Sequence, residues 1–335
     1  MDFVEVRTQA ELDRQLERAD VVPVCVGNGH FRVGAEAIVE AGDGATVQAH
    51  DSATVTAWGT AVVDASDRAA VEAWDRAAVE ARDSATVQAW SNATVQAYDT
   101  VTVRAYDGST VRAWQQARVA ASGRTHVRTR HQTVVVADQQ AFVEAWGRAT
   151  VRASGQVTVR ARGSATVEAR DSTIVEATET ATVRALDGAT VRAGGDAVVE
   201  AAGYATVRAR DNVTVRAARY VAVLRHGDEA TVDGGAVIQV PEVLTASAWC
   251  ELYGVQVADG VAILYKAADD DGPYLCPRPY LASGLEAGER FAAWPVRVTD
   301  ILIDEHPVHP YKVRARKAAG PVYEVDIDGH PAASR

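Results

Sequence analysis

Large apolar side chains are scarce in this sequence of 335 residues. It contains 4 Phe, 1 Met, 7 Ile and 11 Leu, although hydrophobic residues make up 47% of the chain. A conventional globule of this size needs larger side chains to fill its interior at normal packing density. Valine and alanine must therefore form the core, and that core must be thin.

Cysteine is rare as well. The three cysteines, Cys25, Cys250 and Cys276, are too few and too scattered for a disulfide framework, which fits a reducing compartment. The first residues lack the layout of a signal peptide, and no apolar run approaches about 18 residues. The balance of 34 basic against 45 acidic side chains argues against a nucleic-acid partner. We therefore expect a soluble, cytoplasmic protein with no membrane partner.

What the sequence does contain is an eight-residue tandem repeat. Every eighth residue from Val39 to Val223 is valine, which makes 24 consecutive octads with no insertion or deletion. Alanine follows two positions after the valine in 22 of the 24 octads, and polar residues separate the apolar ones. This period of two is typical of a strand with one buried face. The other positions are rich in Asp, Gly, Ser and Asn, so each octad predicts one strand and one corner.

Strict octads predict a β-solenoid, and the outward residues distinguish two strands per coil from three. In a 16-residue coil, residues 16 apart stack at about 4.8 Å along the axis. This spacing gives two columns of alternating charge, which are Arg152, Glu168, Arg184, Glu200, Arg216 and Glu144, Arg160, Glu176, Arg192. A 24-residue coil would stack like charges instead. We therefore predict a mainly β fold: a two-sided β-solenoid with 16 residues per coil and about 12 coils.

The same spacing aligns aromatic residues into two columns. One column is Trp58, Trp74, Trp90 and Tyr106; the opposite side carries Tyr98, Trp114 and Trp146, interleaved with Arg130 and Arg162. The simplest interpretation is stacking that stabilises the column, and the alternatives are contact with a protein subunit or binding of a flat ligand such as a sugar. We take the seven aromatic residues as the candidate interface.

Non-repetitive sequence flanks the octads at both ends. Residues 1–36 predict an N-terminal cap of strand, helix and strand, in which Thr8 and Glu11 form a capping box and Leu12 and Leu16 line the helix. Such a cap would cover the unpaired end of the solenoid. We expect the solenoid at residues 37–228, an exit linker at 229–245 and a small α+β domain at 246–335.

The last 90 residues differ in composition, because they contain all three lysines. We expect a helix from Ala248 to Tyr253, a hairpin that turns at Asp259 and Gly260, and further strands at 291–298, 301–303, 312–316 and 322–327.

Four segments of this region carry a resemblance to a known group of proteins. They are Trp249–Gly254, Leu264–Ala267, Trp294–Val298 and Val322–Asp326. With the octads before them, they resemble a group of actinobacterial proteins in which Ala-Thr-Val-x-Ala octads precede a small C-terminal domain. The resemblance implies the two-part organisation and no established activity. Members often carry a Gly-rich Cys-Gly-x-Gly-Leu-His segment after the hairpin, which is shortened here to residues 274–279.

Two repeated residues suggest other ligands of the solenoid. Threonine precedes the valine in 13 of the 24 octads, which resembles ice-binding solenoids, but the neighbouring outward residues are usually charged or Gln. A column of aspartates could hold calcium between coils. It consists of Asp51, Asp67, Asp83 and Asp99. A turn residue that accepts backbone hydrogen bonds is the simpler interpretation of each.

The C-terminal domain offers a candidate anion site. Lys312, Arg314 and Arg316 alternate along one expected strand, and Arg290 and Arg297 come shortly before it. His306 and His309 with a cysteine are a weak zinc pattern, and Asp269–Asp271 fit a solvated turn better than a cation site. The sequence contains no Ser-His-Asp set, P-loop or dinucleotide motif, so no catalytic residue and no cofactor is assigned.

These observations favour a structural or interaction protein over an enzyme. A rod with a thin, regular core supplies rigidity and length but no pocket. Its partner would be a second copy of itself or another protein. The alternatives are an effector or enzyme whose C-terminal domain binds a phosphorylated ligand or nucleotide, and binding of carbohydrate or ice along the repeat.

Overall fold

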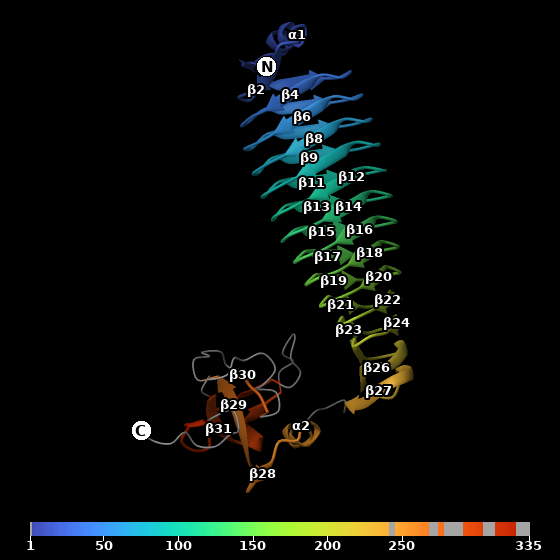
Figure 1. Cartoon of the computed structure of the whole chain (residues 1–335), viewed down its shortest axis with the longest axis vertical. Helices are drawn as coiled ribbons and strands as arrows, with labels where there is room; N and C mark the ends of the chain where they lie inside the picture. Colours follow the sequence, from blue (N-terminus) through green and yellow to red (C-terminus); the bar gives the residue numbers. More distant parts are fainter. Residues whose placement is uncertain (1, 241–244, 268–273, 278–290, 304–311, 326–335) are drawn as a thin grey trace. The chain divides into compact units, whose positions relative to one another are not determined.

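The computed structural model describes residues 2–240, 245–267, 274–277, 291–303 and 312–325 (Figure 1). The chain divides into two compact units, Met1–Gln239 and Val240–Arg335. The boundary lies within the expected linker, but that stretch is not a simple linker, because strand β27 (Thr231–Val240) occupies most of it. No helix among the described residues has the length and apolar character needed to cross a bilayer.

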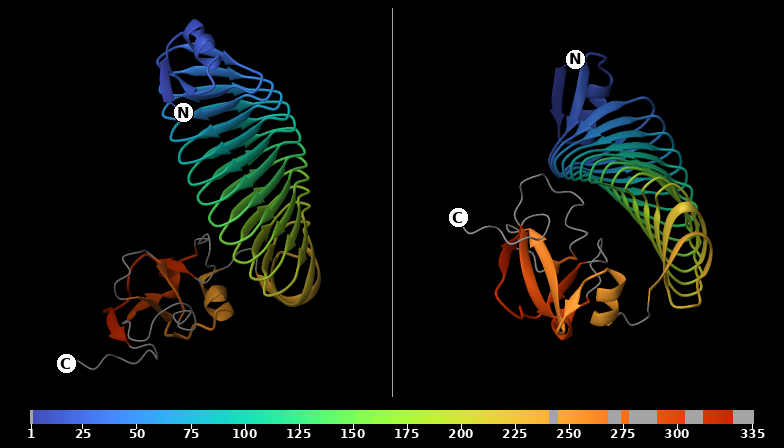
Figure 2. Two further views of the ribbon diagram at one scale, coloured as in Figure 1. Left: turned by 45° about the horizontal axis from the view of Figure 1, so that its top comes forward. Right: turned by 60° about the horizontal axis from the view of Figure 1, so that its bottom comes forward.

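The first unit is the predicted parallel β-solenoid with two strands per coil (Figures 1 and 2). Strands with even numbers form one wall: β4 (Ile38–Ala41), β6 (Thr54–Ala57), β8 (Ala70–Ala73), β10 (Thr86–Ala89), β12 (Thr102–Ala105), β14 (Arg118–Ala121), β16 (Val134–Ala137), β18 (Thr150–Ala153), β20 (Thr166–Ala169), β22 (Thr182–Ala185) and β24 (Val198–Ala201). Strands with odd numbers form the other: β5 (Thr46–Ala49), β7 (Val62–Ala65), β9 (Ala78–Ala81), β11 (Thr94–Ala97), β13 (Thr110–Ala113), β15 (His126–Thr129), β17 (Phe142–Ala145), β19 (Thr158–Ala161), β21 (Ile174–Ala177), β23 (Thr190–Ala193) and β25 (Thr206–Ala209).

Each strand pairs with the strand one coil before and one coil after it, at an offset of 16 residues. Val87, for example, lies in register with Val71 on one side and Val103 on the other. The solenoid has about 15 turns of roughly 16 residues, close to the 12 expected from the octads alone. The difference arises at the ends, where flanking strands continue the same pairing. We name the outward surface of the even strands the even face and that of the odd strands the odd face; each includes the residue that follows every strand.

The core between the walls consists of valine and alanine, as the composition predicts. The octad valines from Val39 to Val223 and the alanines beside them are buried. Polar exceptions are few in the described residues. Thr129 replaces an octad alanine and is buried, and its hydroxyl accepts a hydrogen bond from the Thr133 hydroxyl, which satisfies the pair inside the core.

The N-terminal cap contains the expected strand, helix and strand: β1 (Asp2–Val6), α1 (Gln9–Leu16) and β2 (Val21–Cys25). The Thr8 hydroxyl accepts a hydrogen bond from the Glu11 amide, and the Glu11 carboxylate accepts one from the Arg7 amide. Leu12 is buried beneath α1. An additional strand, β3 (His30–Val33), pairs with β5, and β2 pairs with β4, so the cap joins both walls of the solenoid.

The last coil is closed by longer strands. β26 (Thr214–His226) pairs first with β24 and then with β25, so that one continuous strand crosses from one wall to the other. The amide at the start of β27, that of Thr231, donates to the Val213 carbonyl.

The described part of the C-terminal unit is small and mixed, with one α-helix and two sheets. The helix is α2 (Ala246–Leu252), capped by the Thr245 hydroxyl. One sheet contains β28 (Val257–Ala258), β29 (Val261–Ala267), β31 (Phe291–Arg297) and β34 (Tyr323–Val325). The other contains β30 (Tyr274–Leu275), β33 (Val313–Ala315) and β32 (Ile301–Leu302), the last preceded by a 3-10 turn at Val298–Asp300. The core of the C-terminal unit contains Trp249, Leu264, Val296 and Val313.

Candidate interaction faces of the solenoid

The aromatic column of the even face is a stack of three rings. Trp74 and Trp90 lie with ring centroids 4.2 Å apart and planes 5° apart, and Trp90 stacks on Tyr106 at 5.6 Å. Trp58 belongs to the same column but does not stack on Trp74; its ring covers Gly42, where a Cβ would lie 2.7 Å away. The column therefore forms as the spacing predicts, with one ring fewer in the stack.

The geometry of this stack limits what it can bind. Rings at 4.2 Å cover each other's faces, so the Trp74 and Trp90 indoles present mainly their edges to solvent. A sugar that packs on an aromatic residue needs an open ring face, and the interior of this stack offers none. Trp74 is nevertheless 39% exposed, so the edges form an apolar ridge on the even face.

The odd face carries the second aromatic column, in which rings alternate with arginines. Tyr98 stacks on Trp114 with centroids 4.6 Å apart and planes 7° apart. The Arg82 guanidinium lies 5.9 Å from the Tyr98 ring, and that of Arg130 lies 5.7 Å from the Trp146 ring. Such cation–π contacts fix the arginine side chains on a flat surface.

A shallow groove of about 490 Å³ surrounds this column on β13, β15 and β17. It is lined by Arg112, Ala113, Trp114, Arg128, Arg130, Glu144 and Trp146. Arg128 donates to Glu144 at 2.6 Å, whereas Arg112 and Arg130 form no ion pair with any described residue. The groove therefore carries three guanidinium groups against one carboxylate. The whole stretch between Asp107 and Asp138 contains five arginines and no acidic residue.

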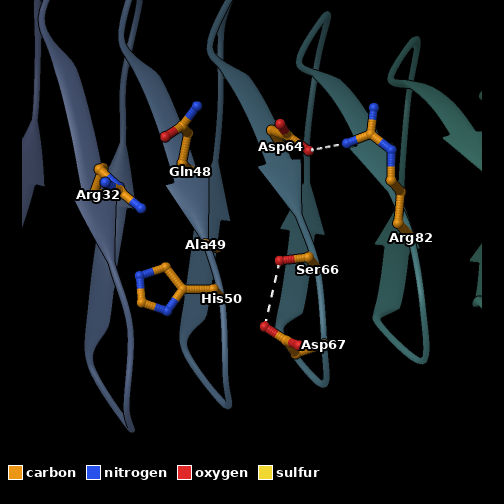
Figure 3. Close-up of a pocket in the computed structure, with 8 residues that line it drawn as sticks. All are labelled: Arg32, Gln48, Ala49, His50, Asp64, Ser66, Asp67 and Arg82. Atoms are coloured by element: carbon orange, nitrogen blue, oxygen red, sulfur yellow. Dashed lines mark hydrogen bonds and ion pairs between the residues drawn. The ribbon is translucent and has the colours of Figure 1, made fainter.

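A second depression, of about 330 Å³, lies on the same face nearer the N-terminus (Figure 3). Gln48 from β5 and His50 after it, with Asp64 from β7 and Ser66 and Asp67 after it, line the depression, with Arg32 and Arg82 at its ends. Arg82 bridges two carboxylates, since it binds Asp64 at 2.9 Å and also Glu80. This depression is polar, with two arginines and two aspartates, whereas the first groove is basic and aromatic.

The charge columns predicted from the 16-residue spacing are present. Arg152 pairs in register with Glu168, and Glu176 with Arg192. Arg160 contacts Glu176 at 3.0 Å and Glu144 at 3.9 Å. Because these pairs are largely exposed, each contributes only about 0–1 kcal/mol, and their main effect is to fix the register of the coils.

The column of aspartates contains structural residues at the corners of the coils. Asp51, Asp67, Asp83 and Asp99 have φ between 51° and 58°, in the left-handed region. Each carboxylate accepts a hydrogen bond from the corner amide one coil earlier; the Asp51 carboxylate, for example, accepts from the Ala35 amide at 3.0 Å. That bond, together with the one from His50, lowers the pKa of Asp51. The described residues contain no cluster of potential metal ligands.

The C-terminal anion candidates do not form one stripe. Arg297 ends β31 in one sheet, whereas Lys312, Arg314 and Arg316 lie on and beside β33 in the other. Arg290 falls outside the described residues, as do His306, His309 and Asp269–Asp271. The three cysteines are buried and form no disulfide, and burial raises the pKa of the Cys25 thiol to about 12.

Sequence reasoning missed the feature that most distinguishes the odd face, which is the separation of acidic and basic blocks along it. The register that aligned the aromatic columns also aligns Asp64, Glu80, Arg112 and Arg128, so the signal was present in the 16-residue spacing.

Comparison of the chain with family models, curated proteins and solved structures gives no match to any of them.

Proposed function

We propose that this protein is a rigid interaction scaffold, in which the solenoid associates through its flat faces and carries the C-terminal unit on the same chain. The uninterrupted parallel pairing from β2 to β26 supports this, because every coil is held by backbone hydrogen bonds to its neighbours. The interior is filled by valine and alanine side chains. The solenoid thus offers extended surfaces for recognition.

The observation that carries the proposal is the pair of aromatic columns on the outward faces of the solenoid. Trp, Tyr and Arg are the residues that contribute most to protein–protein binding, and they concentrate here at Trp74, Trp90, Trp114 and Trp146 with Arg130 between the last two. The exposed edges of the even-face stack suit contact with another flat protein surface better than contact with a sugar.

Native mass, measured by size-exclusion chromatography with light scattering between about 1 µM and about 100 µM, tests the proposal. We expect the intact chain to exceed the 35.6 kDa of one copy as concentration rises. The double variant Trp74→Ser/Trp90→Ser removes the even-face ridge and is expected to lower the extent of association. Leu186→Ser, in the same column six coils away, is the matched control. A mass of one chain at every concentration would contradict association with itself.

A further inference from the structure

The central column of the odd face has an unusual order of charges. It is formed by the third residue of each odd strand from β5 to β17, and these residues are in register from coil to coil. In order they are Gln48, Asp64, Glu80, Gln96, Arg112, Arg128 and Glu144. Two acidic residues precede Gln96 and two arginines follow it, so the charges are antisymmetric about Gln96 over five consecutive coils.

These charges are only partly neutralised within one copy. Asp64 and Glu80 share a single arginine, Arg82, and Arg128 binds Glu144 at 2.6 Å, whereas Arg112 has no ion-pair partner among the described residues. Glu80 and Arg112 are separated by two strand spacings, about 9.6 Å, with Gln96 between them. By contrast, in the alternating column of β18 to β26 every interior charge already lies between two opposite charges.

A second copy of the chain supplies a partner for Arg112 and places the basic block over the acidic one. A two-fold axis that runs along the strand direction at Gln96 places the odd faces of two copies against each other, antiparallel, with each column over itself in reverse order. Glu80 then faces Arg112 of the second copy, and Asp64 faces Arg128 of the second copy. Because the contact is isologous, each of these pairs occurs twice. A parallel arrangement would instead place like charges on like charges.

We propose that the odd face between Gln48 and Glu144 is a self-association surface on which a second copy docks antiparallel about Gln96. This inference rests on the proposed scaffold function and names its partner and its contact surface. The partner's chemistry follows from charge complementarity, since the surface that best matches this face is the face itself.

The neighbouring columns agree with this arrangement. In the aromatic column Tyr98 lies at the axis, Arg82 faces Trp114 of the second copy, and Ser66 faces Arg130 of the second copy. The pairs bring the basic groove over the depression of Figure 3, which carries Asp64 and Asp67. In the column formed by the first residue of each odd strand, Ala78 faces Thr110 of the second copy. These side chains are short enough to let the two faces approach.

The size of the surface is sufficient for a reversible dimer. Six strand spacings at about 4.8 Å and six residues at about 3.3 Å give a face of roughly 29 by 20 Å. This corresponds to about 600 Å² per copy, or about 1,200 Å² in total, at the lower end of specific interfaces. The match ends beyond Gln48 and Glu144, because Arg32 would face Arg160 of the second copy.

Charge reversal in the intact chain tests the proposal through two complementary variants. Arg112→Glu/Arg128→Glu and Asp64→Arg/Glu80→Arg each place like charges on like charges in a dimer with themselves. We expect each variant alone to dimerise at least about 100-fold more weakly than the wild type, with native mass as the readout. An equimolar mixture of the two restores every opposite-charge pair, and we expect the dimer to return.

The control variant Arg124→Glu/Arg148→Glu makes the same change in net charge at two exposed corners, outside both faces, and is expected to dimerise as the wild type does. Recovery of the dimer on mixing also shows that both reversed variants are folded. The wild-type dimer is expected to weaken as ionic strength rises, because its pairs lie at a solvent-exposed interface.

The outcomes separate this inference from the proposed function. Association that survives both charge reversals but is lost in Trp74→Ser/Trp90→Ser would overturn the odd-face dimer and leave the scaffold proposal standing. Reversed variants that stay monomeric when mixed would overturn the antiparallel register. A wild-type chain that is monomeric at every concentration would overturn both the dimer and scaffold self-association.

Discussion

At the scale of single residues, the corner of each coil explains the composition of the octad. The residue four positions after the octad valine adopts positive φ at most corners, which favours Gly, Asn and Asp over other residues. At seven of the described corners this residue is Asp or Glu and its carboxylate accepts a hydrogen bond of 3.3 Å or less. The donor is the backbone amide 16 residues earlier, at the equivalent corner of the preceding coil. The Asp-rich corners are therefore structural on two grounds, backbone conformation and hydrogen bonding.

Substitutions at Asp83 separate these two grounds. Asp83 has φ of 58° and its carboxylate accepts from the Asp67 amide at 3.3 Å. Asp83→Asn keeps both features and is expected to change stability little, Asp83→Gly keeps only the conformation, and Asp83→Ala loses both, at a cost of about 1–2 kcal/mol. Urea unfolding followed by circular dichroism ranks the variants, and equal midpoints for the Asn and Ala variants would contradict this account.

At the scale of elements, the cap shows how the solenoid avoids an open edge. The Gln9 side chain on α1 donates to the Arg32 carbonyl at 3.0 Å and accepts from the Arg32 amide at 2.8 Å. One side chain thereby takes the place of a missing strand beside β3. Unpaired strand edges are sites of aggregation, so this contact protects the first coil.

Replacement of Gln9 tests this role at a single amide. In Gln9→Ala the Arg32 amide loses its acceptor, and we expect its hydrogen exchange to accelerate by about 10-fold, equivalent to roughly 1.4 kcal/mol of lost protection. Gln9→Glu still offers a side-chain oxygen as the acceptor for the Arg32 amide and serves as the control. If the Arg32 amide exchanges equally fast in the wild type and in Gln9→Ala, the contact does not protect the edge.

Much of the element structure could be predicted because the octads repeat a local rule. The strict Val and Ala spacing specified strand length, inward residues and the 16-residue coil, whereas α2 spans Ala246–Leu252 instead of the expected Ala248 to Tyr253. The path of β26 could not be predicted in this way, because the strand continues through residues 218–220, where the octad rule predicts a corner. The position of Arg297 relative to Arg314 depends on sheet topology, which periodicity does not reveal.

At the scale of the whole solenoid, coils contact only their neighbours, so stability is distributed along the axis. Val183 is fully buried in β22, whereas Thr182 beside it is exposed on the even face. No long-range contact connects the first coils to the last within the repeat. Local damage should therefore remain local.

The pair Val183→Asp and Thr182→Asp tests how far such damage extends. Each adds one carboxylate at neighbouring positions, but only the first buries it, at an expected cost above about 4 kcal/mol. Hydrogen exchange read by mass spectrometry should show lost protection in β20 to β24 for Val183→Asp and retained protection near the cap. Thr182→Asp should match the wild type. Uniform loss along the chain would show that the coils unfold as one unit.

The corner hydrogen bonds also have a direction. Each is completed by a side chain that comes 16 residues later in the chain, as when the Asp99 carboxylate accepts from the Asp83 amide. A ribosome releases the polypeptide in that same order, from the N-terminus onward. At these seven corners a coil that emerges supplies the acceptor that its predecessor lacks, so we expect the first coils to be completed in the order of synthesis.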